Sequence, residues 1–102
     1  MYASLRKWIN VPYQYRPFLK YNGAGVRQLG DPVDSMCYPV GDTKFVTDVS
    51  GAQKVSTMQL YVPGTENIKV NDTVVIAGEE RAIYRITSYY REGTVDLKVV
   101  YL

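Results

Sequence analysis

Turn signals recur at short intervals from residue 36 onward, and they limit the chain to short, extended segments. Between them lie runs rich in valine, isoleucine, threonine and tyrosine, in which apolar and polar residues alternate. Alternation with a period of two places successive side chains on opposite faces of a strand. The pattern predicts an antiparallel barrel or sandwich of six or seven strands, with strands at 36–40, 44–49, 54–62, 68–70, 73–77, 81–90 and 94–102.

Length and composition predict a single domain that spans residues 1–102. The chain has 102 residues, of which 46% are hydrophobic and 22% charged, a balance that argues against disorder. Its longest apolar runs are far shorter than a bilayer-crossing helix requires. Cys37 is the only cysteine, so we expect no internal disulfide and a buried thiol that packs as a small hydrophobic group.

The absence of histidine removes several classes of chemistry. Without it the chain lacks the commonest general base near pH 7, the commonest metal ligand and the Ser-His and Cys-His nucleophile pairs. Glu79 and Glu80 are adjacent carboxylates, but they follow Gly78 in a predicted hairpin turn. No phosphate-binding loop or Cys/His metal spacing is found in the sequence. We therefore expect a protein that is not an enzyme and that holds neither a cofactor nor a metal.

The first 35 residues are organised differently from the rest. Residues 1–12 predict an N-terminal arm with a short helix over 4–10, because Leu5, Trp8 and Ile9 share one helical face. An extended segment follows at 13–21, interrupted by Pro17. Residues 22–35 contain three glycines and a proline without any period. They predict a long loop, a feature that small domains usually keep for function.

Charge and tyrosine are the two remaining signals. The net charge is only +2, yet residues 1–30 carry five bases and no acid, as a docking face for an acidic partner or a polyanion would. Tyrosine, with ten copies, is favoured at protein interfaces. We expect Tyr84 and Tyr101 in the core. The expected partner contacts are Trp8, Tyr13, Tyr15, Arg16, Tyr89 and Tyr90.

The order of these features resembles a known family. The stretch at 45–61 and the block formed by Asn71-Asp72, Gly78 and Tyr84-Arg85-Ile86 follow a long glycine-rich loop. Together they resemble the small head-closure proteins of tailed bacteriophages, also called stopper or minor capsid proteins. The resemblance covers roughly residues 20–102 and is a pattern of hairpins and turns, without a catalytic motif.

Membership of that family would imply a structural subunit of the head–tail connector in the virion neck. Such subunits form a ring below the portal and adaptor rings, and bind tail completion proteins on another face. The long loop projects into the channel and helps to retain packaged DNA. Assembly would take place in the host cytoplasm. Carried onto this sequence, the channel loop would include Gly23, Gly25, Arg27, Gly30, Asp31 and Asp34.

A different class of function is also compatible with the residues. An OB-like or SH3-like barrel that binds single-stranded nucleic acid combines aromatic and basic side chains on one surface. Tyr13, Tyr15, Arg16 and Tyr21, or else Tyr89, Tyr90 and Arg91, would supply the stacking and phosphate contacts. The small net charge and the ten acidic residues argue against this alternative.

Overall fold

The structure is a computed structural model that describes residues 7–102. This part of the chain contains β-strands and no helix. Seven strands form one antiparallel sheet in the order β10-β11-β7-β4-β1-β8-β9. The expected all-β class is confirmed. The strands are β1 (Val11–Arg16), β2 (Phe18–Tyr21), β3 (Arg27–Leu29), β4 (Val33–Val40), β5 (Lys44–Thr47), β6 (Gln53–Ser56), β7 (Gln59–Pro63), β8 (Thr73–Ile76), β9 (Glu79–Ala82), β10 (Arg85–Arg91) and β11 (Thr94–Tyr101).

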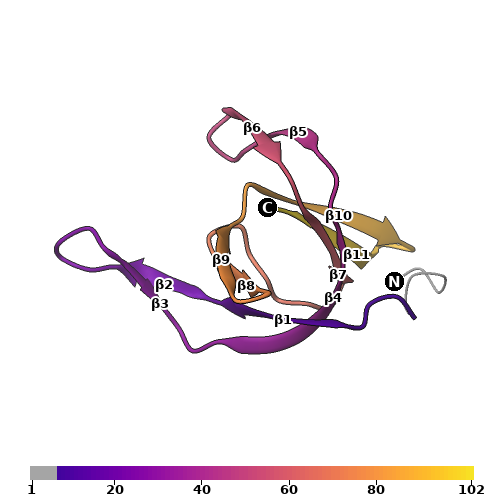
Figure 1. Cartoon of the computed structure of the whole chain (residues 1–102), viewed down its shortest axis with the longest axis horizontal. Helices are drawn as coiled ribbons and strands as arrows, with labels where there is room; N and C mark the ends of the chain where they lie inside the picture. Colours follow the sequence, from indigo (N-terminus) through magenta and orange to yellow (C-terminus); the bar gives the residue numbers. More distant parts are fainter. Residues whose placement is uncertain (1–6) are drawn as a thin grey trace.

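The sheet curls into a half-barrel, and β4 forms the bend (Figure 1). The first part of β4 pairs with β1, from Val33 opposite Tyr15 to Cys37 opposite Val11. Its last three residues pair with β7 instead. Pro39, which has no N–H to donate, lies in this second part opposite Leu60. The change of partner along one strand lets the two halves of the sheet face each other.

Two tight hairpins complete the sheet at its ends. Ala77 and Gly78 join β8 to β9, and Glu92 and Gly93 join β10 to β11. All four residues have positive φ angles, of 52°, 78°, 53° and 80° in chain order. Two successive residues with positive φ form the type I′ turn, whose twist matches that of the flanking strands. The turn predicted at Glu92-Gly93 is therefore confirmed.

Two hairpin arms extend from the sheet (Figure 1). Arm 1 consists of β2 and β3 and continues the β1–β4 hairpin beyond Pro17. Arm 2 consists of β5 and β6 and continues the hairpin of β4 and β7. The described chain is accordingly longer in one direction, with extents of 46 × 30 × 29 Å.

The core fills the inside of the curl. Cys37 is completely buried there, as expected. Thr57 and Leu102 tie the last strand to the β6–β7 junction, because the Thr57 N–H donates to the Leu102 carbonyl at 3.1 Å. Within the described part of the chain, nothing has the length and hydrophobicity of a membrane-crossing helix. The buried core residues are Tyr13, Tyr15, Cys37, Leu60, Val62, Ile68, Val74, Ile76, Ile83, Val100 and Leu102.

The glycine-rich segment 22–35, expected as a single loop, contains β3 and the first part of β4 instead. Only residues 22–26 form a turn. The Asn22 side chain closes it, because its Oδ1 accepts the N–H groups of Ala24 and Val26 at 2.8 and 3.0 Å. Strand pairing then satisfies the backbone polar groups that follow, which the composition of the segment does not reveal.

The short helix expected over 4–10 is not found in its described portion. Lys7 and Trp8 form a turn, and the Asn10 N–H donates to the Trp8 carbonyl at 3.0 Å. This bond joins residues two apart, whereas an α-helix joins residues four apart. Residues 4–6 of the expected helix lie outside the described residues.

Several predicted strands differ from those in the structure. The expected strand at 54–62 is two strands, β6 and β7, and the one at 81–90 is β9 followed by β10. Both are interrupted by a two-residue corner, at 57–58 and at 83–84, where the chain bends around the half-barrel. Residues 68–70 form no strand, although Ile68 is buried and Val70 packs against the core. Glu79 and Glu80 belong to β9 rather than to the turn before it.

Candidate functional site

The side of β4, β7, β11 and β10 that faces away from the core is also largely apolar. Strand register places Tyr38 opposite Tyr61, Tyr61 opposite Val99 and Val99 opposite Thr87. The core side of the same strands carries Leu60, Val62 and Val100. We call the outer side the aromatic face and define it by Tyr38, Tyr61, Pro63, Tyr89, Leu97, Val99 and Tyr101.

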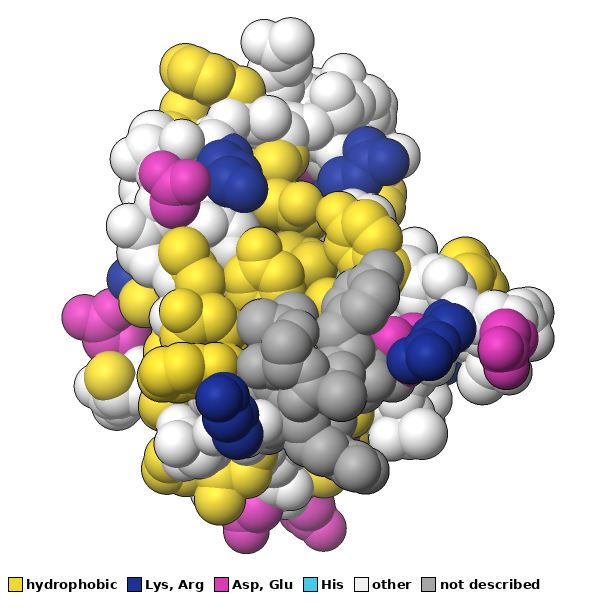
Figure 2. Space-filling view, turned by 90° about the vertical axis from the view of Figure 1, so that its right-hand side faces the viewer, with side chains coloured by type: hydrophobic (Ala, Val, Ile, Leu, Met, Phe, Trp, Pro, Cys, Tyr) yellow, Lys and Arg dark blue, Asp and Glu magenta, His cyan; other side chains and the backbone are white. Residues whose placement is uncertain are grey.

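Rings dominate the aromatic face. Tyr38 lies between Trp8 and Tyr61, with ring centroids 6.3 and 5.9 Å away. Trp8 is 52% exposed, whereas Leu97 and Val99 on the same side of the sheet are each only 2% exposed. Figure 2 shows a continuous hydrophobic area on this side of the molecule, with Lys and Arg side chains around it.

An apolar outer face favours protein binding. Antiparallel sheets commonly pack one face on the core and leave a polar face to water, but here neither face is polar. Most of this face is buried or half-buried, but Trp8 and Tyr89 at its margins are exposed, and exposed apolar side chains beside such a face often mark an interaction site. Tyrosine and tryptophan suit such a site because they combine a large apolar area with a polar group. The aromatic face is therefore a candidate surface for a protein partner.

Arm 1 presents a second exposed apolar surface. Leu19, Tyr21 and Val26 are all exposed on it. Its rings are ordered by one another and by a cation: Phe18 and Tyr21 lie edge to face at 5.1 Å, and the Arg27 guanidinium lies 5.4 Å from the Phe18 ring centroid. The arm thus carries a compact aromatic and basic cluster close to its base.

The base of arm 1 is anchored to the loop between β7 and β8. The Phe18 N–H donates to Asp72 Oδ1 at 2.9 Å, and the Arg27 side chain donates to the Asn71 carbonyl. Asp72 is itself buried, and its Oδ2 accepts the Lys69 N–H at 2.9 Å. These bonds fix the direction in which the arm leaves the sheet.

The residues predicted for a channel loop are spread along arm 1 and beyond its base. Gly23 and Gly25 lie in the tip, where Gly25 has a φ of +79°. Arg27 begins β3, and Gly30 and Asp31 follow that strand. Asp34 lies in β4, where its Oδ1 accepts a hydrogen bond of 2.6 Å from Gln14.

The residues predicted for a partner interface separate into two groups. Tyr13 and Tyr15 are buried on the core side of β1, so this structure removes both from the surface. Burial raises the pKa of Tyr15 to about 12 and that of Tyr13 further still, with the nearby Glu66 carboxylate adding to both shifts. Both phenols therefore ionise only at a higher pH than an exposed tyrosine does.

The other predicted contacts remain accessible to differing degrees. Trp8, Tyr89 and Tyr90 are exposed, whereas Arg16 is half-buried and its Nε donates to the Gly30 carbonyl at 3.3 Å. The burial of Tyr13 and Tyr15 also removes half of one residue set proposed for nucleic-acid stacking. Tyr101, expected in the core, is half-buried on the aromatic face, and Tyr84 is half-buried at the corner before β10.

Three important surface residues were missed in the sequence. Tyr38 and Tyr61 form the centre of the aromatic face, and Phe45 on arm 2 is 78% exposed. A signal existed for Tyr61, because it alternates with the buried Leu60 and Val62. No such signal existed for Phe45. Apolar residues alternate in its strand as they do in a strand whose apolar side is covered, so the pattern does not indicate that Phe45 is exposed.

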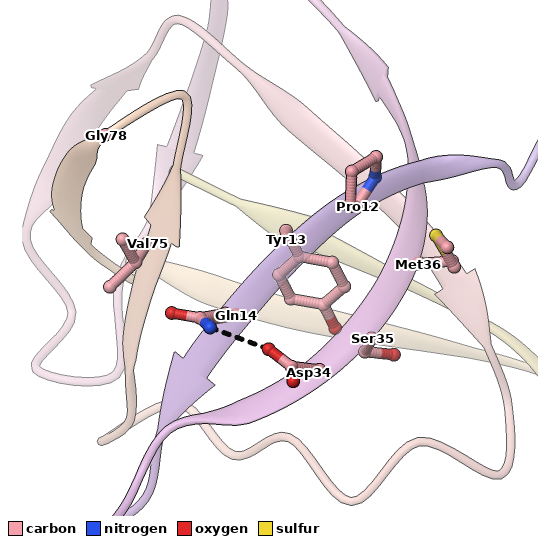
Figure 3. A pocket seen from close by; sticks show the side chains of 8 residues that line it. All are labelled: Pro12, Tyr13, Gln14, Asp34, Ser35, Met36, Val75 and Gly78. Atoms are coloured by element: carbon pink, nitrogen blue, oxygen red, sulfur yellow. Dashed lines mark hydrogen bonds between the residues drawn. The ribbon is translucent and has the colours of Figure 1, made fainter.

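A depression of about 560 Å³ lies on the other half of the sheet, and Figure 3 shows its lining. Pro12, Met36 and Val75 supply apolar surface, and the Gln14–Asp34 hydrogen bond crosses from β1 to β4. Among residues 7–102 no three histidine, cysteine, aspartate or glutamate side chains group as a metal site. The depression offers shape and one amide–carboxylate pair rather than an acid–base arrangement.

No protein-family model and no curated protein matches this sequence.

Proposed function

We propose that the chain is a structural subunit of the head–tail connector of a tailed bacteriophage, a head-closure protein that assembles into a ring. In this proposal the ring lies below the portal and adaptor in the virion neck and binds tail completion proteins on its other side. Arm 1 points into the central channel and helps to hold the packaged DNA. Neither a cofactor nor a metal takes part.

The observation that carries the proposal is arm 1, which extends from a curled sheet and is fixed at its base. A closing element needs a defined direction and a tip with few buried contacts. The hydrogen bonds of Phe18 and Arg27 to the loop before β8 fix the direction of the arm. The tip at 22–26 is exposed and has few buried contacts. The aromatic face supports the same proposal, because ring subunits need surfaces for unlike neighbours.

The decisive experiment shortens arm 1 without touching the sheet. Phe18 and Leu29 are paired residues, so replacing residues 19–28 with Asn-Gly joins them by a two-residue hairpin turn. A matched variant, Leu19→Ser/Tyr21→Ser, keeps the length of the arm and changes only its exposed apolar side chains.

We expect the shortened variant to fold and to join the neck of the phage that encodes it. Electron microscopy of the heads would then show the ring, and nuclease sensitivity of their DNA would show leakage. The full-length Leu19→Ser/Tyr21→Ser variant should retain DNA, because the arm still reaches the channel. Retention of DNA by heads whose ring carries the shortened arm would contradict the role of arm 1.

A further inference from the structure

Among residues 7–102 no further strand pairs with either edge of the seven-stranded sheet, and the two edge strands differ in how well they are protected. β9 has four residues, including Glu79, Glu80 and Arg81, with an ion pair of 3.3 Å between Glu79 and Arg81. Short, charged edge strands resist pairing with other chains. β10 is seven residues long and carries charge only at its ends, at Arg85 and Arg91. Its five central residues are Ile-Thr-Ser-Tyr-Tyr, which favour strand pairing.

A cavity lies on each face of β10 near its beginning. One, of about 310 Å³, is lined by Ile86 together with residues 47–49 of arm 2. The other, of about 300 Å³, is lined by Thr87 and by residues 45–47. Ile86 and Thr87 are consecutive in the strand, so their side chains point to opposite faces. Arm 2 and β10 supply most of the lining of both cavities, together with Val70 in the first and Tyr101 in the second.

Arm 2 is held in this position by Arg85, whose Nη1 donates to the Thr47 carbonyl at 3.3 Å. Phe45 of the arm lines the cavity beside Thr87, and the residue is 78% exposed. An open strand edge with a side-chain cavity on each face is the arrangement used for strand addition. There, backbone hydrogen bonds hold an extended peptide and the cavities select its alternate side chains.

We propose that the open edge of β10 binds an extended, acidic segment of a partner protein by strand addition. Arg85 and Arg91 are six residues apart, about 20 Å along a strand, so the bound segment would have about seven residues with an acid near each end. Small apolar or hydroxyl side chains between them would enter the two cavities. The inference concerns how this chain binds a partner, and it stands whether or not the chain forms a ring.

The charges around this edge select an acidic partner over a basic one. Lys44 and Lys54 of arm 2 add to the two arginines, and both are exposed. Asp48 is the acidic group in the cavity lining, but its Oδ1 already accepts hydrogen bonds from the backbone N–H groups of Ser50 and Ala52, at 2.9 and 3.0 Å. These bonds hold the carboxylate in the turn of arm 2 and keep it ionised, so the two arginines and two lysines outnumber it. Glu92 lies beyond the strand, in the β10–β11 turn.

The test uses the isotope-labelled full chain and a synthetic peptide, acetyl-Glu-Val-Thr-Val-Thr-Val-Glu-amide. We expect the largest changes in NMR amide shifts at residues 85–91 and 44–47. A peptide with lysine at both ends should bind at least tenfold more weakly at low salt, and the difference should shrink at high salt because exposed charges are screened. An acidic peptide with Pro-Pro at its centre should not bind, because proline cannot donate to a strand ladder.

Charge reversal on the protein provides the complementary test. Arg85→Glu/Arg91→Glu should weaken binding of the acidic peptide at least tenfold and should favour the lysine peptide. Arg91→Glu alone leaves the Arg85 bond to arm 2 intact, and it should show a smaller change in the same direction. Lys20→Glu is the control, because it reverses one positive charge at an exposed position on arm 1, away from β10. This variant should bind the acidic peptide with the affinity of the wild type.

Four results with added peptide or oligonucleotide would overturn the proposal. The first is that 2 mM acidic peptide produces no amide shifts at β10, and the second is that the acidic and lysine peptides bind with equal affinity. The third is that the Pro-Pro peptide binds as tightly as the acidic peptide without proline. The fourth is that a single-stranded oligonucleotide shifts the same amides more strongly than the acidic peptide does. Concentration-dependent shifts at β10 in the free chain would likewise overturn it, because the partner would then be a second copy. None of these results bears on arm 1, so DNA retention tests the proposed connector function separately.

Discussion

Gly64 lies against the backbone of Val95 so closely that a Cβ at position 64 would stand 2.0 Å from the Val95 carbonyl oxygen. The Gly64 N–H also donates to the Asp96 carbonyl, at 3.2 Å. Asp96 is the extra residue of a β-bulge in β11, because Tyr89 pairs with Leu97 and Tyr90 with Val95. The end of β7 therefore packs directly on this bulge, and only glycine leaves room for the contact.

Replacing Gly64 with alanine should destabilise the fold strongly. The added methyl group meets backbone atoms, which cannot rotate away, and overpacking of this kind costs about 1–3 kcal/mol or more. Gly41→Ala is the matched control, because nothing lies within 4 Å of a Cβ there. Urea unfolding monitored by circular dichroism measures both variants. Equal stability of the two would contradict the close contact.

Ala77→Asn should stabilise the protein. Ala77 has a φ of 52°, a left-handed conformation that costs an ordinary residue about 1–2 kcal/mol and that asparagine tolerates better. We expect a gain of about 0.5–1 kcal/mol in the free energy of unfolding. Gly78→Ala in the same turn should have the opposite effect, because it places a second methyl group at positive φ. A melting temperature that falls in Ala77→Asn would argue against the type I′ turn.

Asp72→Ala should loosen the base of arm 1. It leaves the backbone N–H groups of Phe18 and Lys69 without the carboxylate that accepts both. Because both bonds are only partly buried, water replaces part of each, and we expect a loss of about 1 kcal/mol per bond in the free energy of unfolding. Hydrogen exchange should speed up at these two amides in particular. Asp31→Ala, at an exposed aspartate after β3, is the control and should change neither the stability nor the exchange.

The protein should lose stability in alkaline solution. Burial raises the pKa of Cys37 from 9.0 to about 11, and burial with the Glu66 interaction raises that of Tyr15 from 10.0 to about 12. Above pH 9 the unfolded chain therefore releases protons that the folded chain retains. Stability should be constant with respect to these groups below pH 9 and fall on the order of 3 kcal/mol by pH 11.

Urea unfolding at closely spaced pH values between 7 and 11 measures this dependence. Cys37→Ala should move the onset of the decline from about pH 9 to about pH 10, where tyrosine ionises in the unfolded state. Tyr21 is exposed, so Tyr21→Phe should leave the profile unchanged. A wild-type profile that stays flat from pH 9 to 11 would contradict the burial of both groups.

Local patterns in the sequence predicted the elements but not their surroundings. Alternation placed Leu60 and Val62 together on one side of a strand, and both are in the core. The same reasoning could not show that Tyr61, on the other side, faces a second apolar surface. Alternation with a period of two indicates which residues share a face of a strand. It does not indicate what covers that face, because the covering strands are distant in sequence.

The sequence by itself determined the all-β class, the buried Cys37 and the turn at Glu92-Gly93, because each depends on short-range sterics or on one side chain's hydrophobicity. Only the tertiary structure decided that Tyr13 and Tyr15 are buried, that residues 27–35 are largely strand, and that β10 keeps an open edge beside arm 2. The burial of the two tyrosines follows from the curl of the sheet, and the other two features follow from which strands pair. Strand order and register couple residues tens of positions apart, so no local pattern contains them.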